Sequence, residues 1–376
     1  MAMTHRENIL AILNYEKAER VPMIHFGFWR ETLEKWEAEG RLLPHENTLP
    51  WDGTPSVESI ASRLGFDCGW GWGVSGRTGL FPSFKEQILE VTPDGFEKVL
   101  NEEGVIIMRK PGIVSIPMEV GHTLVDRESY ERDFKHRFQM DPGRLDFEEM
   151  DESYNRAVAS GAPIGIGCGS MLGYIRNIVG VEGLSYIYAD DEDLFTEIID
   201  TVADMNYQVI KAILDRGYKV DHGHFWEDIC FKNGPLVIPS VFDEKCGHHY
   251  KRVSELLKAH GANFVSVDCD GLIDSLIPTW LDNGINIMFP IEVGTWEANI
   301  APWREKYGKD LRGIGGMDKR VFAASDRSEI DKEIERLKPL VALGGYIPCV
   351  DHRIPPDAIW ENVQYFCDRF NNEFNK

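Results

Sequence analysis

Apolar and polar positions alternate in the second half of the chain in a pattern that predicts repeated pairs of helix and strand. Residues 250–260 carry Val253, Leu256 and Leu257 at helical spacing and end at Gly261, and the apolar run 264–267 follows. Helices are likewise predicted over 272–282, 300–307 and 330–343, each followed by a strand, over 285–291, 311–316 and 345–350. This alternation is typical of βα units around a parallel sheet. We predict an α/β fold, a single (β/α)8 TIM barrel.

The N-terminal third has a different pattern. Residues 6–14 form an amphipathic helix, and residues 21–24 lead into a first strand. The segment 97–110 has two alternating runs on either side of Glu102, Glu103 and Gly104, which predicts a β-hairpin. We interpret residues 1–120 as an N-terminal extension with a hairpin inserted at the mouth of the barrel. No low-complexity linker follows it, so residues 1–376 are predicted to form one domain.

Composition narrows the classes of function. The chain has 376 residues, 43% of them hydrophobic, which is ordinary for a globular protein. A formal charge of −22 argues against a broad nucleic-acid or anionic-membrane surface, because both need clustered positive charge. No stretch approaches the roughly 18 to 20 apolar residues that span a bilayer. Seven scattered cysteines without a CxxC pair suit free thiols, so we expect a cytoplasmic protein. The oligomeric state stays open, a homodimer included.

Polar residues follow four consecutive predicted strands. They are Asp268 to Gly271, Glu292, Gly315 to Asp318, and Asp351 with His352. Because the carboxyl ends of barrel strands share one face, these side chains should converge. Asp268, Asp270, Glu292 and His352 form a plausible ligand set for zinc, which accepts carboxylates and imidazole. The alternative is that these carboxylates cap helices or pair with lysine and arginine.

A second group lies in residues 221–228. His222 and His224 have the spacing of a metal-binding pair, although such pairs are at least as often pocket or core residues. Glu227 is a candidate general acid, because burial beside Phe225 and Trp226 would raise its pKa toward neutrality.

Aromatic residues are dense between Phe26 and Trp72. About half of them are expected in the core, and the rest suit a pocket that stacks on a substrate ring. The residues predicted to bind substrate are Phe28, Trp29, Trp70, Trp72, His224 and Trp226.

Several motifs in order resemble the uroporphyrinogen decarboxylase-like superfamily, and its corrinoid-dependent methyltransferase branch most closely, including the O-demethylases. The motifs are Arg20-Val-Pro22, Glu227-Asp228, Val267-Asp-Cys-Asp-Gly271, Gly315-Gly-Met-Asp-Lys319, Gly344-Gly-Tyr-Ile-Pro-Cys-Val-Asp-His-Arg-Ile-Pro-Pro-Asp357 and Glu361-Asn362. The resemblance implies a (β/α)8 barrel that moves a methyl group from a small substrate to the cobalt of a corrinoid protein, with zinc activating the substrate.

The sequence departs from the thiol-activating members of that branch. Asp268-Cys-Asp270 stands where those members carry a His-x-Cys zinc-binding pair, and His352 stands in place of a late cysteine. A zinc site with oxygen and nitrogen ligands in place of sulfur favours an ether oxygen over a thiol, so we expect a methoxyaromatic methyl donor. Methylamines and other methyl donors stay open. In this interpretation Glu227, Asp268 and His352 are catalytic, and zinc is held by ligands among Asp268, Asp270, Glu292 and His352.

The corrinoid is expected on a separate protein, because the chain contains no Asp-x-His-x-x-Gly attachment motif. One rival function is decarboxylation of a polycarboxylate. The decarboxylase carries an Arg-Gln-Ala-Gly-Arg motif after its opening strand, whereas this chain has residues 25–30 there, with the single arginine Arg30. The other rival is a catalytically silent barrel.

Overall fold

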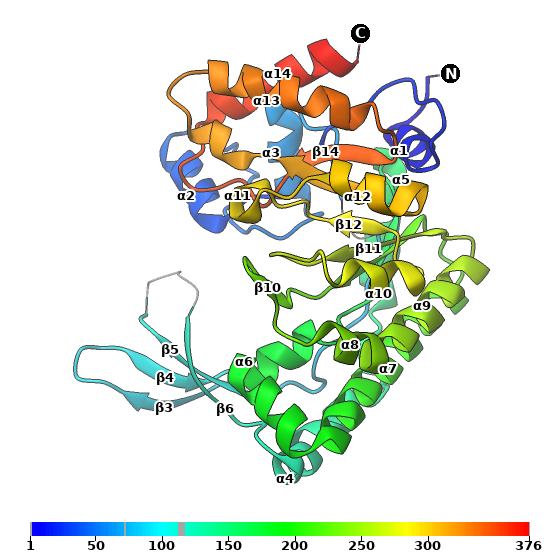
Figure 1. Cartoon of the computed structure of the whole chain (residues 1–376). Coiled ribbons are helices and arrows are strands. Elements are labelled where there is room, and N and C mark those ends of the chain that lie inside the picture. Colours follow the sequence, from blue (N-terminus) through cyan, green and yellow to red (C-terminus); the bar gives the residue numbers. More distant parts are fainter. Residues whose placement is uncertain (1, 71–72, 112–116, 376) are drawn as a thin grey trace.

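The computed structural model describes residues 2–70, 73–111 and 117–375, and eight parallel strands form one curled sheet in it (Figure 1). In sheet order the strands are β2 (Cys68–Gly69), β1 (Ile24–His25), β14 (Tyr346–Val350), β13 (Arg312–Met317), β12 (Ile287–Phe289), β11 (Phe264–Asp268), β8 (His222–Trp226) and β7 (Gly165–Gly167). Beyond β2, Val74 pairs in parallel with Ile166 of β7 and joins the two edges. The predicted (β/α)8 fold is confirmed.

Helices surround this sheet. They are α1 (His5–Leu13), α2 (Arg30–Ala38), α3 (Pro55–Leu64), α4 (Arg127–Ser129), α5 (Phe147–Ser160), α6 (Gly173–Asp190), α7 (Glu192–Asp215), α8 (Pro239–Phe242), α9 (His248–Ala259), α10 (Ile277–Asp282), α11 (Val293–Trp296), α12 (Ile300–Tyr307), α13 (Ser328–Val341) and α14 (Trp360–Phe374). The predicted helix over 272–282 is shorter, because Pro278 lacks an N–H and is tolerated only in the first turn. None of the helices in the described ranges has the length and apolar character that a bilayer crossing requires.

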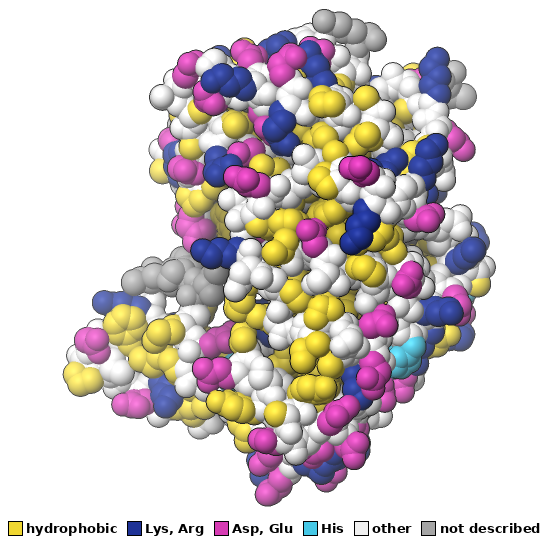
Figure 2. Space-filling view, in the orientation of Figure 1, with side chains coloured by type: hydrophobic (Ala, Val, Ile, Leu, Met, Phe, Trp, Pro, Cys, Tyr) yellow, Lys and Arg dark blue, Asp and Glu magenta, His cyan; other side chains and the backbone are white. Residues whose placement is uncertain are grey.

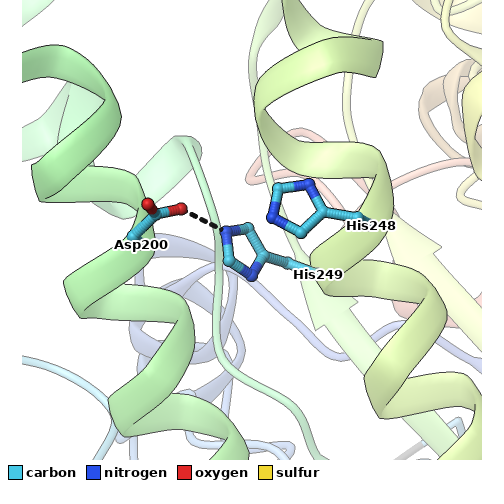
Figure 3. A group of neighbouring side chains, drawn as sticks. All are labelled: Asp200, His248 and His249. Atoms are coloured by element: carbon cyan, nitrogen blue, oxygen red, sulfur yellow. Dashed lines mark hydrogen bonds and ion pairs between the residues drawn. The ribbon is translucent and has the colours of Figure 1, made fainter. Parts of the chain in front are cut away.

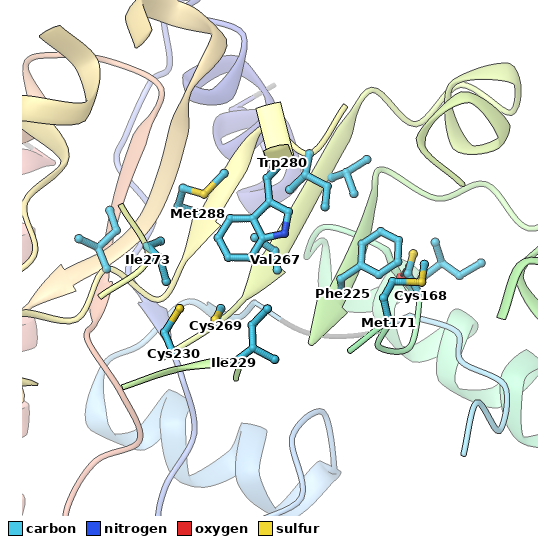
Figure 4. Packing of buried hydrophobic residues seen from close by; sticks show 14 of the residues in the cluster. Cys168, Met171, Phe225, Ile229, Cys230, Val267, Cys269, Ile273, Trp280 and Met288 are labelled. Atoms are coloured by element: carbon cyan, nitrogen blue, oxygen red, sulfur yellow. Dashed lines mark hydrogen bonds between the residues drawn. The ribbon is translucent and has the colours of Figure 1, made fainter. Parts of the chain in front are cut away.

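Two apolar cores hold the barrel together. Inside the sheet, Ile9 and Leu13 of α1 pack on Ile24, Ile314 and Ile347, so α1 closes the end where the strands begin. The second core lies between the sheet and the outer helices, and Figure 4 shows part of it. With the amino end closed, the carboxyl end of the sheet is left for a site.

A small antiparallel sheet is inserted between β2 and β7. Its strands are β3 (Gln87–Val91), β4 (Glu97–Leu100), β5 (Val105–Arg109) and β6 (Met118–His122). The predicted hairpin is present as β4 and β5, and β3 and β6 extend it to four strands. The small sheet projects on the side away from α1 (Figure 1) and exposes the apolar residues Ile88, Leu89, Val91, Met118 and Val120 (Figure 2).

Candidate active site

A cavity of about 290 Å³ opens at the carboxyl ends of the barrel strands. Its wall combines carboxylates, histidines and aromatic rings from most parts of the chain. The lining residues are His25, Phe26, Gly27, Trp29, Asp52, Gly53, Glu58, Gly69, Trp70, His224, Trp226, Asp228, Asp268, Asp270, Phe289, His352 and Arg353. Asp268, Asp270 and His352, which were predicted to converge at the strand ends, are among these residues.

Three carboxylates meet in this wall. Asp268 ends β11, Asp270 follows it in the next turn, and Asp228 follows β8, the neighbouring strand. One ligand oxygen from each of them lies within 4.8 Å of the other two. The Asp270 N–H donates to Asp228 Oδ1 at 3.0 Å, and Asp228 has a left-handed backbone with φ 45°. Aspartate is one of the few non-glycine residues that adopt this conformation readily.

The carboxylates of this cluster repel one another. Burial and then the Asp270 charge raise the pKa of Asp228 from 3.8 to about 6. Burial, with the charges of Asp228 and Asp270, raises the pKa of Asp268 well above its usual range. In the described residues the buried Oδ1 of Asp270 has no hydrogen-bond partner. A cation between the three groups would relieve the repulsion and occupy that oxygen, so the cluster fits a divalent metal ion.

His352 lies beside the acidic cluster. Its Nε2 is 3.2 Å from Oδ2 of Asp270. Its ring stacks on Trp29, with centroids 5.3 Å apart, and is tilted against Phe26 at the same separation. His352 is thus held between the carboxylates and the aromatic part of the wall.

Glu292 lies outside the lining of the cavity. Its Oε2 accepts the Gly271 N–H at 2.7 Å and its Oε1 accepts the Thr295 hydroxyl at 2.5 Å. Burial and the nearby Asp270 charge raise the pKa of Glu292. Its observed contacts fix the turn that carries Asp270.

Glu227 is also outside the lining and is fully buried. Its carboxylate accepts the Gly173 N–H at 2.8 Å and two further backbone N–H groups at the start of α6, together with the hydroxyls of Ser170 and Tyr250. Burial raises the pKa of Glu227, and these hydrogen bonds oppose that rise. The side chain is engaged with α6 and turned away from the cavity.

Of the residues predicted to bind substrate, Trp29, Trp70, Trp226 and His224 line the cavity. Ser266 Oγ binds His224 Nδ1 at 2.7 Å and accepts the Trp70 indole N–H at 3.3 Å. Burial lowers the pKa of His224 to about 3, so its ring is neutral.

Phe28 is not among the described residues that line the cavity. Phe28 is fully buried and packs on Trp36, because Gly27, at φ 78°, interrupts the alternation of side chains after β1. Trp72 falls outside the described residues. Phe26, two residues before Phe28, faces the cavity in its place.

Five polar residues of the wall were not predicted as site residues. His25 lies with a ring nitrogen 3.3 Å from Glu58, and Arg353 binds Asp52 at 2.6 Å. Asp52 and Glu58 precede β2 in loop and helix, where no strand-end signal marks them. Asp228 is the fifth, and its place two residues after the end of β8 could have marked it as a candidate.

No protein-family model matches the sequence, and no curated protein is significantly similar to it. Among solved structures, a methyltransferase from Methanosarcina mazei is similar over 98% of this chain and 99% of its own, with a TM-score of 0.60 and 15% identity. A B12-independent methionine synthase from Shewanella sp. W3-18-1 has a TM-score of 0.45 at 11% identity, over 84% of this chain and 85% of its own. The similarity to the first structure establishes a shared fold, which is the fold that the superfamily resemblance predicted.

Proposed function

We propose that the protein is a methyltransferase that demethylates a small methoxyaromatic substrate and passes the methyl group to the cobalt of a corrinoid on a separate protein. The observation that carries this proposal is the wall of the cavity. In it a cluster of three carboxylates and an imidazole faces aromatic rings at the carboxyl end of a barrel. Such a cavity combines a site for a cation with a surface for an aromatic substrate.

Asp228, Asp268 and Asp270 are the residues that would hold a metal ion, and the proposal assigns zinc. Bound there, zinc would supply Lewis-acid polarisation of the ether oxygen and make the phenolate a better leaving group. We assign Glu292 to positioning, because it fixes Gly271 directly after Asp270. Glu227 holds the end of β8 against α6 and so positions Asp228, the next residue.

His352 is assigned to proton transfer. The oxygen that leaves the methyl group needs a proton, and the imidazole lies in the cavity wall with Nε2 next to Asp270. Stacking on Trp29 fixes the ring plane, which limits the positions that the proton can reach. In this arrangement His352 orients Asp270 and protonates the product.

The aromatic residues of the wall position the substrate. Small-molecule pockets range from about 300 to 1,000 Å³, so this cavity suits a substrate with a single ring. Trp29, Trp70 and Trp226 offer ring faces for stacking, which supplies orientation. A polycarboxylate substrate fits poorly. Arg353 is the single arginine of the described wall, and it is paired with Asp52.

The corrinoid partner would have to approach the carboxyl end of the barrel. The small sheet of β3 to β6 projects on that side and exposes apolar side chains (Figures 1 and 2). It is therefore the surface that we would expect a partner to contact.

The test of the proposed function is to incubate zinc-loaded protein with reduced cobalamin and a panel of methoxyaromatics, and to record the methylcobalamin spectrum. Failure of the whole panel, repeated with a corrinoid protein, would favour a silent barrel.

The charge of the cavity favours a second methyl donor. Carboxylates surrounded by aromatic rings also suit a methylated ammonium ion, which such rings bind through cation–π contacts. In that case the substrate itself would be the cation beside Asp228, Asp268 and Asp270. The same panel therefore includes methylated amines, with and without zinc. Methylcobalamin formed from an amine in zinc-free protein would select this donor over the ether.

A further inference from the structure

A second group of metal-binding side chains lies on the outside of the barrel, where α7 and α9 pack against each other. Asp200 comes from α7, and His248 and His249 are the first residues of α9. One ligand atom of each of the three lies within 4.8 Å of the others. Figure 3 shows both rings between the two helices, with His249 bonded to Asp200.

The two histidines are arranged unusually for consecutive residues of a helix. Side chains at adjacent helical positions normally point in different directions. Here the ring centroids of His248 and His249 are 3.9 Å apart, so both rings turn to the same side. A π-helical turn, Asp243–Gly247, directly precedes them. Such turns occur often at functional sites.

The contacts of the two rings leave ligand atoms available for a metal ion. His249 Nε2 lies 2.7 Å from Oδ1 of Asp200. Within the described residues, the buried Nδ1 of His249 has no partner. The nearby cation Arg252 is held by Asp204 at 2.6 Å.

We infer that Asp200, His248 and His249 form a second metal site, for zinc or a similar divalent transition ion, that joins α7 to α9. Two imidazole nitrogens and one carboxylate oxygen match the ligands of zinc, whereas calcium and magnesium prefer oxygen ligands alone. His248 is exposed, so the remaining coordination positions face solvent. The site is separate from the cavity and does not depend on the proposed methyl transfer.

The competing explanation is a plain hydrogen bond between Asp200 and His249 that fastens the two helices. The variant His248→Ala separates the two explanations, because it removes one ligand and leaves that hydrogen bond intact. Because His248 is exposed, the variant should fold as the wild type does. The matched control is Asp193→Asn, which removes an exposed carboxylate near the start of α7.

The experiment is a zinc titration of the whole chain against a chromophoric chelator, with elemental analysis of bound metal. We expect His248→Ala to bind one zinc ion fewer than the wild type, or to bind it about tenfold or more weakly. Zinc should also raise the melting temperature of the wild type more than that of His248→Ala. The control Asp193→Asn should behave as the wild type.

Unchanged stoichiometry and affinity in His248→Ala would overturn the inference. A second variant, Asp200→Asn, must show the same loss, and normal zinc binding by it would overturn the inference as well. Asp270→Asn reports on the cavity cluster independently. The loss of one ion in that variant and of another in His248→Ala would show two sites, and either loss can fail without the other.

Discussion

Replacing Asp228 with asparagine should stabilise the metal-free protein while removing its capacity to bind metal in the cavity. The ionised form of Asp228 destabilises the folded protein, because burial and the charge of Asp270 raise its pKa from 3.8 to about 6. Asparagine keeps the oxygen that accepts the Asp270 N–H, and it adopts a left-handed backbone at least as readily. The substitution therefore removes the charge and preserves the local geometry.

The size of the effect follows from the pKa. A rise from 3.8 to about 6 corresponds to about 3 kcal/mol, at about 1.4 kcal/mol for each tenfold change in the proton equilibrium. Because burying the asparagine amide also has a cost, only part of this energy is recovered, and we expect a gain of about 1 to 3 kcal/mol in the free energy of unfolding at pH 7.5. The folded-state pKa lies above the unfolded one. The ionisation of Asp228 thus destabilises the wild type progressively between about pH 4 and 6. The stability gained by Asp228→Asn should be absent below that range and constant above it.

The assay is urea unfolding of both proteins at pH 4.5, 6 and 7.5 in the presence of a chelator. Asp318→Asn is the control with the opposite sign. Burial would raise the pKa of Asp318, but the hydrogen bonds from Arg320 bring it below the usual value. That variant should lose stability at pH 7.5. An Asp228→Asn protein that is less stable than the wild type at pH 7.5, or whose difference does not depend on pH, would refute the repulsion among these carboxylates.

Three further predictions concern the surroundings of the cluster. Glu227→Gln should cost about 2 to 4 kcal/mol of stability in urea unfolding, because its amide N–H would face the buried N–H groups at the start of α6; a neutral substitution would mean that the carboxylate is not needed there. Zinc affinity of the cavity should rise with pH through about 6, because Asp228 and Asp268, whose pKa values are both raised, must lose their protons to bind the ion; a flat profile in competition titrations from pH 5 to 8 would contradict this. Trp29→Ala should weaken methoxyaromatic binding about tenfold in calorimetry, through the loss of stacking. The exposed Tyr186→Ala is its control, and equal affinities in both variants would remove Trp29 from the site.

The convergence of Asp268, Asp270 and His352 could be predicted because it follows from topology alone. Parallel barrel strands deliver whatever follows them to one face, so the order of strands in the sequence was enough. The outward positions of Glu227 and Glu292 could not be predicted in this way. Both carboxylates bind backbone N–H groups of turns that only the folded chain brings near them.

The aromatic residues of the wall also could not be fully predicted, in this case because of the conformation of a single neighbouring residue. Phe26 and Phe28 are both phenylalanines and lie two positions apart, so the sequence does not distinguish them. The left-handed backbone of Gly27 between them decides which ring faces the cavity. A glycine in the sequence permits such a conformation without requiring it. The hairpin of β4 and β5, by contrast, could be predicted from its turn. The neighbouring strand β3 could not, because it is exposed along its whole length and lacks the alternation of apolar and polar residues that marks a strand.

The most direct test of the central claim is transfer of an isotopically labelled methyl group. Zinc-loaded protein would be given a methoxyaromatic carrying a ¹³C-methyl group together with reduced cobalamin, and products would be followed by NMR and mass spectrometry. We expect ¹³C-methylcobalamin and the free phenol in equal amounts with the wild type, and at least a hundredfold less of both with Asp270→Asn. Equal label transfer by Asp270→Asn, or none by the zinc-loaded wild type with any methyl donor or corrinoid protein, would contradict it.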